Sequence, residues 1–463
     1  MHQSRVMMKP ANRWFAPARR RSSAIMRIFV GCLIFILGVF SSVLIHFIGD
    51  FYVTEVLLIA LFPFLALLEG RRLLRPSLKK IFLLLGLWFV GLVLSDAYRQ
   101  TEIINRLRGM ALIGFFVVLI ATFSIILTGD ERQKIIFLTA YAIGSVVVAK
   151  ISPTETRESD IRWKFGYANG TIILVVLVSC YFYARRKYVP AALCLAAIAG
   201  YNLLVNYRSA FLEIMITAVL VVPIIPERIG RFRLLPRKRG LVHVLIVTVL
   251  ALGAGWSASK ILTYASSAGY LTDQAKEKNE AEAKAGNLIL GGRREFFVGL
   301  RAVADSPILG HGSWPSDRKY AEMMADMEAE TGVRMNWNEE IEANSGLIPA
   351  HSHIVGAWVF AGILGVPFWA YLLWLVARAT VQVAILRPPL APIYCYLFIT
   401  LFWAILFSPF GSWERIFEAV TIVIIIDLLE PRTVSASKPS LVRKARWRRS
   451  GSVRPSLIAS HRT

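Results

Sequence analysis

Long apolar runs alternate with short polar runs along most of the chain. Each apolar run is close to the ~20 residues that a helix needs to cross a hydrocarbon layer about 30 Å thick. The first run is too long for the apolar core of a signal peptide, so it is interpreted as a membrane span. The pattern predicts an all-α polytopic membrane protein with about 12 transmembrane helices, over residues 26–48, 51–69, 80–96, 109–128, 133–150, 168–185, 189–206, 209–226, 240–262, 351–377, 389–408 and 411–430.

Composition agrees with this pattern and excludes two other classes of protein. Hydrophobic residues make up 56% of the 463 residues, and the mean hydropathy of +0.55 is higher than that of most soluble proteins. A net charge of +23 could indicate a nucleic-acid partner, but the basic residues cluster in tails and short loops, where they act as orientation signals. The 4 cysteines lie in apolar runs without a CxxC pair, which supports neither a disulfide framework nor a zinc site.

Basic residues fall in alternate connections between the predicted helices. Because such residues concentrate on the cytoplasmic side of a membrane, and because the number of helices is even, both termini and all basic connections are predicted to be cytoplasmic. The basic segments are residues 13–27, 71–80, 132–134, 185–187, 228–239 and 443–449.

One connection on the predicted outer side is much longer than the others. Loops of this length without a function are uncommon. The predicted organisation is a basic tail (1–25), transmembrane helices 1–9 (26–262), an outer loop with amphipathic helices (263–350), transmembrane helices 10–12 (351–430) and a second basic tail (431–463).

Two stretches of the outer loop are predicted to be helical. Asp273–Lys284 is charged and rich in helix-forming residues. Pro307 is predicted to end the second stretch, and an irregular turn is expected at 310–315. The second stretch has apolar residues three and four positions apart, which predicts a helix lying against the membrane or the bundle; they are Phe296, Phe297, Leu300, Val303 and Ala304.

Three cationic or titratable residues are predicted on the outer side, where Arg and Lys are scarce. Arg208 begins a predicted span; it could extend to the interface, pair with Glu213, or bind an anion, for which the planar guanidinium is suited. Arg293 follows two glycines at the start of the amphipathic helix, where backbone amides attract anions. Arg106, Arg162 and Arg294 are further candidate anion contacts.

His351 is predicted at the start of the tenth transmembrane helix, after Pro349. The dipole of a helix N-terminus favours a neutral imidazole there, and a neutral imidazole can accept a proton from a hydroxyl group. A polar histidine at the membrane interface without a catalytic role is the alternative. His353, two residues further, is expected to tolerate substitution.

The order of these motifs resembles the O-antigen ligase and O-antigen polymerase superfamily of bacterial membrane glycosyltransferases. The resemblance rests on Tyr-Arg-Ser-Ala at 207–210, Gly-Arg-x-x-x-Phe at 292–297, DSPILGHG at 305–312 and AHSHIVGAWVFAGILG at 350–365. It is strongest over 206–365, and FGYANGTIIL at 165–174 resembles a further family segment. Many members have Asn where this chain has Ser352.

The resemblance implies a metal-independent glycosyltransferase without a cofactor in the bacterial inner membrane. It would transfer a glycan from undecaprenyl pyrophosphate to an acceptor glycan or to lipid A-core at the periplasmic face, in lipopolysaccharide or exopolysaccharide biosynthesis. Arg208 and Arg293 would hold the pyrophosphate, and His351 would activate or orient the acceptor hydroxyl. Ligase and polymerase both remain open.

A transporter or flippase for lipid-linked oligosaccharides is the alternative from a different class. It would also need outer arginines. Against it, the sequence shows no internal repeat, and ionisable residues within the predicted spans are few beyond Glu55, Glu213 and Asp427, whereas transporters use such residues in their substrate and ion pathways.

Overall fold

Helices form most of the described part of the protein, and several of them are of membrane-spanning length. The computed structural model describes residues 24–46, 49–151, 162–205, 207–222, 294–331 and 345–430, with shorter stretches between 228 and 264. Within these residues, six helical segments are long and apolar enough to cross a membrane. They are Val53–Leu74, Pro76–Arg99, Ile103–Ile126, Glu131–Ile151, Trp163–Ala184 and His353–Leu386. The prediction of an all-α protein with membrane-spanning helices is confirmed at this level.

Most of the expected helices are found within a few residues of their predicted bounds. The helices of the bundle are α1 (Ala24–Phe40), α2 (Val53–Glu69), α3 (Pro76–Arg99), α4 (Ile103–Ile126), α5 (Glu131–Ile151), α7 (Ala168–Ala184), α8 (Tyr188–Leu204), α9 (Arg208–Val221), α15 (His353–Ala361), α16 (Val366–Leu386), α17 (Ala391–Phe407) and α18 (Ser412–Leu429). Short helical turns are η2 (Gly70–Leu74), η3 (Trp163–Tyr167) and η4 (Gly362–Gly365). The ninth predicted span, 240–262, is described only in part.

The first predicted helix is shorter than expected. It ends at Phe40, and a strand, β1 (Leu44–His46), pairs in antiparallel register with β2 (Asp50–Tyr52). The carbonyl oxygen of Leu37 accepts hydrogen bonds from the hydroxyl groups of Ser41, at 2.7 Å, and Thr54, at 2.5 Å. These side chains satisfy the end of α1, because terminal helix carbonyls lack partners within the helix. A second two-stranded ribbon joins β3 (Arg228–Ile229) to β4 (Phe232–Arg233).

The tenth predicted span is interrupted and longer than expected. Gly362 has a positive φ of +62° and separates α15 from η4 and α16. The turn that follows α12 (Arg294–Asp305) lies against this break. Its amides at His311 and Gly312 donate to the carbonyl oxygens at the end of α15, at 2.6 and 3.1 Å. A Cβ atom on Gly362 would lie 1.9 Å from the carbonyl oxygen of Ile308, so only glycine permits this close approach.

The amphipathic helix of the long loop is present as α12. Its buried residues Val298, Ala302 and Val303 pack in a small cluster with Tyr320 and Met324. The two latter residues belong to a second helix, α13 (Arg318–Thr331). That helix was not predicted, although Tyr320, Met324 and Met327 have helical spacing. The predicted helical stretch Asp273–Lys284 lies outside the described residues.

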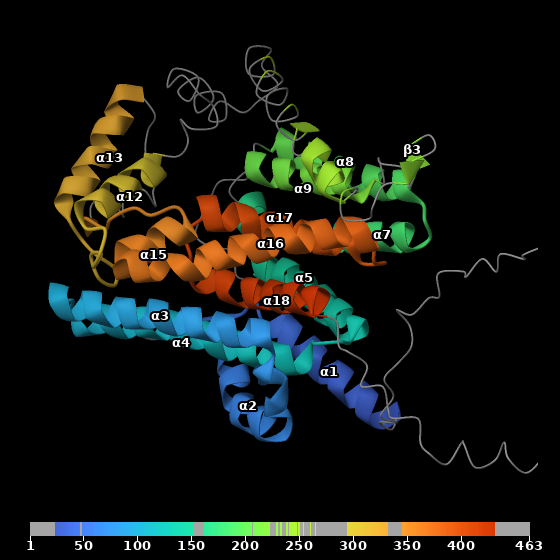
Figure 1. The fold of residues 1–463 in the computed structure, drawn as a ribbon, viewed down its shortest axis with the longest axis horizontal. Helices are drawn as coiled ribbons and strands as arrows, with labels where there is room; N and C mark the ends of the chain where they lie inside the picture. Colours follow the sequence, from blue (N-terminus) through green and yellow to red (C-terminus); the bar gives the residue numbers. More distant parts are fainter. Residues whose placement is uncertain are drawn as a thin grey trace, which may run out of the picture.

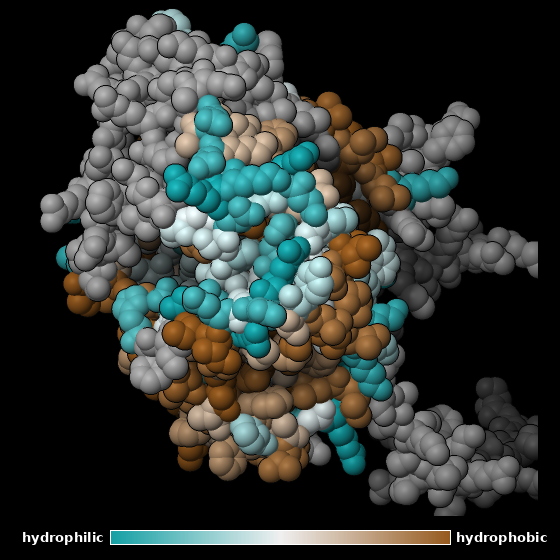
Figure 2. Space-filling view, turned by 90° about the vertical axis from the view of Figure 1, so that its left-hand side faces the viewer, coloured by the Kyte–Doolittle hydropathy of each residue, from teal (hydrophilic) through white to brown (hydrophobic). Residues whose placement is uncertain are grey.

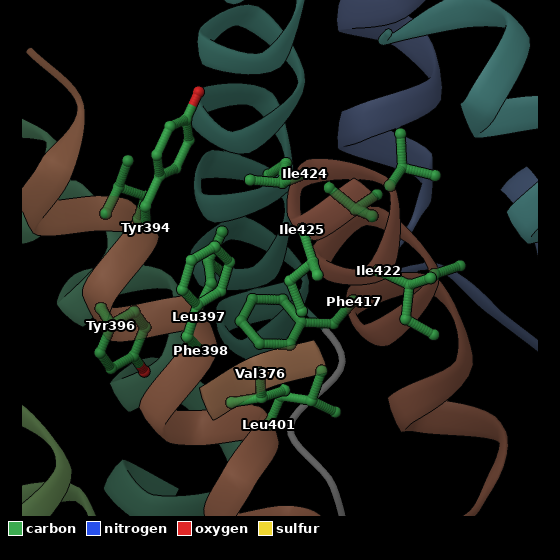
Figure 3. Packing of buried hydrophobic residues seen from close by; sticks show 14 of the residues in the cluster. Val376, Tyr394, Tyr396, Leu397, Phe398, Leu401, Phe417, Ile422, Ile424 and Ile425 are labelled. Carbon is green, nitrogen blue, oxygen red and sulfur yellow. The ribbon is translucent and has the colours of Figure 1, made fainter. Parts of the chain in front are cut away.

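Figure 1 shows α3, α4, α15 and α16 running side by side, with α12 and α13 at one end of the bundle. We call this end, where α3 and α17 finish and α4, α15 and α18 begin, the loop end. The main core runs through the bundle from α1 to α18, and part of it lies between the last two helices of the chain. Phe417 and Ile425 of α18 face Leu397 and Phe398 of α17 (Figure 3), and all four residues are buried.

Candidate functional site

The loop end presents a polar surface (Figure 2). Figure 2 views the molecule from this side and shows hydrophilic residues gathered at its centre, with hydrophobic residues below and beside them. Hydrogen bonds fix the loop onto the helices here. The amide and hydroxyl groups of Ser313 donate to Asp96 at the end of α3, at 2.6 and 2.8 Å, and Arg99 donates to Ser306 and to the Gly310 carbonyl, at 2.7 and 3.0 Å.

His351 lies at this end, but it is not part of a helix. The helix α15 begins at His353, and Ser352 is its N-cap, accepting a hydrogen bond from the Val355 amide at 3.3 Å. The expectation that His351 and Pro349 form the first helical turn is therefore wrong, because the serine hydroxyl takes the capping position. The imidazole of His351 is half-buried. Its Nδ1 atom is buried and has no hydrogen-bond partner among the described residues.

The start of α9 lies toward the same end of the bundle. Arg208 is its first residue and is half-buried. One turn deeper, Glu213 is buried and accepts a hydrogen bond from Thr400 of α17 at 2.9 Å. The segment that carries His351 contacts the same helix nearer its end, because Ser352 donates to the Ile405 carbonyl of α17 at 2.9 Å.

The start of α12 reaches this region too. Arg294 is the first residue of α12, and the ring of Phe296 lies 6.3 Å from that of Phe407 at the end of α17. Arg293 lies outside the described residues. The end of α17 is thus bordered by the first turn of α12 and by the segment that carries His351, while α9 contacts α17 through Glu213 and Thr400.

The additional candidate cations are more dispersed. Arg106 is in the first turn of α4, and its Nε atom is buried without a hydrogen-bond partner among the described residues. Arg162 is exposed and precedes η3, where Trp163 donates to Asn202 of α8 at 3.0 Å. Arg106 and Arg162 therefore lie on different segments of the chain, at the start of α4 and just before η3.

A buried polar cluster beneath His351 is the feature that sequence reasoning missed. His353 and Glu418 are hydrogen-bonded to each other, and each is 1% exposed. Beside them, Arg415 binds both carboxylate oxygens of Glu55, at 2.7 and 2.8 Å. The expectation of few ionisable residues in the predicted spans is therefore wrong for the span predicted at 411–430, which contains Glu414, Arg415 and Glu418. The spacing of Glu414, Arg415 and Glu418 on an otherwise apolar helix could have indicated the cluster.

Two titratable residues of the loop have pKa values set by its packing. Burial lowers the pKa of His311, whose Nε2 atom donates to the Ala302 carbonyl at 2.8 Å. Hydrogen bonds from Lys319 and Tyr320, at 2.6 and 2.8 Å, lower the pKa of Asp305. These contacts join α12 to α13 and to the turn between them.

Comparison of the sequence with family models finds no match, and comparison with curated proteins finds none. Within the residues that the structure describes, three or more His, Cys, Asp or Glu side chains are nowhere grouped as metal ligands would be. The family resemblance and the metal-independent mechanism remain predictions.

Proposed function

We propose that the protein is an O-antigen ligase-like membrane glycosyltransferase. It transfers a glycan from undecaprenyl pyrophosphate to an acceptor hydroxyl, as ligase or polymerase, in lipopolysaccharide or exopolysaccharide biosynthesis. The observation that carries this proposal is the position of His351. A half-buried imidazole, whose Nδ1 atom has no hydrogen-bond partner among the described residues, lies at the end of the bundle where Arg208 and Arg294 begin their helices.

The chemistry needs few groups. Pyrophosphate is a good leaving group, so positioning the reactants and stabilising the developing negative charge can supply most of the catalysis. Arg208 and Arg293 would bind the pyrophosphate oxygens, with Arg294, Arg106 and Arg162 as further contacts. His351 would accept the proton of the acceptor hydroxyl or orient that hydroxyl for attack.

The proposal also assigns a topology. Twelve spans would place both termini in the cytoplasm of a bacterium and the loop end at the periplasmic face of its inner membrane. Reporter fusions at Arg75, Arg186 and the C-terminal tail should then be cytoplasmic, and a fusion at Met323 in α13 should be periplasmic. A cytoplasmic signal from α13 would contradict the site assignment.

The decisive experiment uses purified protein, lipid-pyrophosphate-linked glycan, an acceptor glycan and EDTA. The wild type should form a new glycosidic bond, and Arg208→Ala should nearly abolish it at unchanged membrane insertion. Arg208→Lys should restore little activity, because an ammonium group cannot contact two oxygens in a planar fork. Loss of wild-type transfer in EDTA would contradict the metal-independent mechanism.

A transporter of lipid-linked oligosaccharide is a second candidate, and the buried cluster on α18 favours it. Buried Glu418, Arg415 and Glu55 are the kind of intramembrane ionisable residues that ion-coupled transporters use. Liposomes that contain the purified protein separate the candidates. A transporter moves labelled lipid-linked glycan between leaflets without forming a glycosidic bond, whereas the proposed transferase elongates or transfers it.

A further inference from the structure

The start of α15 is fastened to the end of α17 by two side chains. The hydroxyl of Ser352 donates to the Ile405 carbonyl at 2.9 Å, and Nδ1 of His353 lies 2.6 Å from the Ser408 carbonyl oxygen. Carbonyl groups in the last turn of a helix lack partners within that helix. Ser352 and His353 therefore use acceptors that the end of α17 leaves available, and they hold the chain at its entry into α15.

These contacts determine how many protons the His353–Glu418 pair holds. A carbonyl oxygen can only accept, so Nδ1 of His353 carries a proton and donates it to Ser408. The contact between Nε2 and Glu418 Oε1 also needs one proton. Either neutral imidazole accepts it from a protonated Glu418, or imidazolium donates it to a carboxylate. In both forms the pair shares one proton along this bond.

The surroundings of the pair are mostly apolar. The imidazole of His353 packs against the rings of Trp369 and Phe410, with ring centroids 4.8 and 5.3 Å apart. Of the neighbouring charged groups, Arg415 is engaged by Glu55, and Glu414 lies one turn before Glu418. The Oε2 atom of Glu418 is buried without a hydrogen-bond partner among the described residues.

A buried pair of this kind often contributes less to stability than well-packed apolar side chains would. A buried polar atom without a partner costs about 1–3 kcal/mol, and well-packed apolar side chains of similar volume often stabilise a protein as well or better. Bundle stability alone therefore gives a weak reason for this pair. The position of the pair gives a stronger reason for its presence, because His353 is only two residues after His351.

The chain before His351 is held from its other side by α12. A Cβ atom on Gly299 of α12 would lie 3.2 Å from the Pro349 carbonyl oxygen and 3.7 Å from Cα of Ala350. This close packing fixes residues 349–350, while Ser352 and His353 fix the residues that follow. His351 thus projects from a short segment that is restrained on both sides.

We propose that His353 and Glu418 are positioning residues, which share a proton and hold His351 in the orientation that its reaction requires. This inference rests on the proposed transferase function, but the fixed orientation of His351 can be measured separately. Neither residue needs to contact the substrate. Their effect should be expressed in turnover more than in donor binding.

The test variant is the double substitution His353→Phe with Glu418→Leu. Replacing both partners by apolar groups avoids an isolated buried charge and should leave the protein folded. The matched control is Lys134→Met with Asp427→Leu, which removes a buried ion pair of 2.7 Å at the opposite end of α18. Glu418→Gln serves as the conservative variant, because its amide can donate to neutral Nε2 while Nδ1 keeps its bond to Ser408.

Two readouts are compared in detergent-purified protein. The first is glycan transfer. The double variant should lose about 10- to 100-fold in kcat with a small change in KM. The kcat of Glu418→Gln and that of the control should stay within threefold of the wild type. The second is the rate at which diethyl pyrocarbonate modifies His351, followed by mass spectrometry. This rate should change at least threefold in the double variant and stay unchanged in the control.

Each result has a definite meaning for the proposal. An unchanged His351 modification rate in a folded double variant overturns it, whether or not the wild type is a transferase. An inactive Glu418→Gln beside an active wild type also overturns it, since the proton itself and not the position of His351 would then matter. If the wild type shows no transfer but the modification rate depends on the pair, the proposed function fails and the positioning role stands.

Discussion

The two ends of α18 both carry a buried acidic residue, but these acids are satisfied differently. At the end opposite the loop, Asp427 accepts from Lys134 and from the Gly129 amide, at 2.7 and 2.8 Å, and Arg75 lies 3.5 Å from its other oxygen. At the loop end, Glu418 uses one oxygen for His353, and its second oxygen has no partner within the described residues.

We interpret the contacts of Asp427 as a structural fastening between helices and the surroundings of Glu418 as part of the candidate site. Lys134 also contacts Glu131 at 2.9 Å. The charges of Lys134 and Asp427 therefore compensate each other, and their contacts join α5 and α18 to the connection before α5. At the loop end, Glu418, His351 and Arg106 each have a buried polar atom without a hydrogen-bond partner among the described residues, and at the opposite end Nη1 of Arg75 is another such atom. The two ends therefore differ in how the buried acid itself is satisfied, and an acid with an unpartnered oxygen calls for an explanation, of which a functional role is one.

The largest expected effect concerns His351. His351→Ala should lower turnover by about 10²–10⁴, the usual contribution of a general acid or base, while donor binding changes less because Arg208 remains. His311→Gln, which keeps a donor for the Ala302 carbonyl in the same loop, is the control and should stay near wild type. Steady-state transfer kinetics measure the effects on kcat and KM separately. Near-normal turnover of His351→Ala would contradict a catalytic role for the loop end of α18, as distinct from the structural role of the opposite end.

A second prediction concerns the other polar pair of the loop end. Arg415 and Glu55 form a bidentate buried ion pair, and Arg415 also donates to the Asp50 carbonyl at 3.1 Å. Glu55→Leu alone should destabilise the protein by about 3–5 kcal/mol, because it leaves a buried charge uncompensated.

The double variant Glu55→Leu with Arg415→Leu is the control for this pair and should recover most of the lost stability. Thermal unfolding in detergent, followed by intrinsic tryptophan fluorescence, measures both variants. Equal loss in the single and double variants would mean that the guanidinium group stabilises the fold through the Asp50 carbonyl and the apolar packing, and not through the pair.

A third prediction concerns the fastening at the opposite end. Asp427→Asn keeps hydrogen-bonding atoms but removes the charge facing Lys134, and hydrogen bonds to charged groups contribute about 1.5–3 kcal/mol. Stability should fall by an amount in this range, and the turnover of the folded fraction should match the wild type. A loss of turnover at normal stability would contradict a purely structural role for Asp427.

The sequence allowed prediction of the helices but not of their contacts. Apolar runs of about 20 residues predict spans because hydrocarbon leaves a helix few alternatives, and the spacing of Phe296, Leu300 and Val303 indicated α12. The break at Gly362 was not predicted, because it depends on a loop about 50 residues earlier in the chain. The buried contact of His353 was not predicted either, for a related reason. Its partner, Glu418, is distant in sequence, and helical periodicity carries no information about that contact.

The smallest expected effect is a pH response confined to the loop end. Burial lowers the pKa of His311, with Arg99 acting in the same direction and the Ala302 carbonyl, Asp317 and Asp305 opposing it. The folded loop therefore favours neutral imidazole. Its contribution to stability is fully present above the ordinary histidine pKa of about 6.5 and is lost as the pH falls through that value toward the lower folded pKa.

Amide hydrogen exchange measures this response through the protection of α12 and the turn at 306–312. Between pH 7.5 and 5.5, after correction for the intrinsic pH dependence of exchange, protection should fall by about two- to fivefold, while the amide of Gly129 beside Asp427 serves as the internal reference. His311→Gln should abolish the difference, because an amide donates to the Ala302 carbonyl at either pH. An equal loss of protection at Gly129 would indicate general loosening of the bundle, and it would contradict the assignment of this response to the loop end.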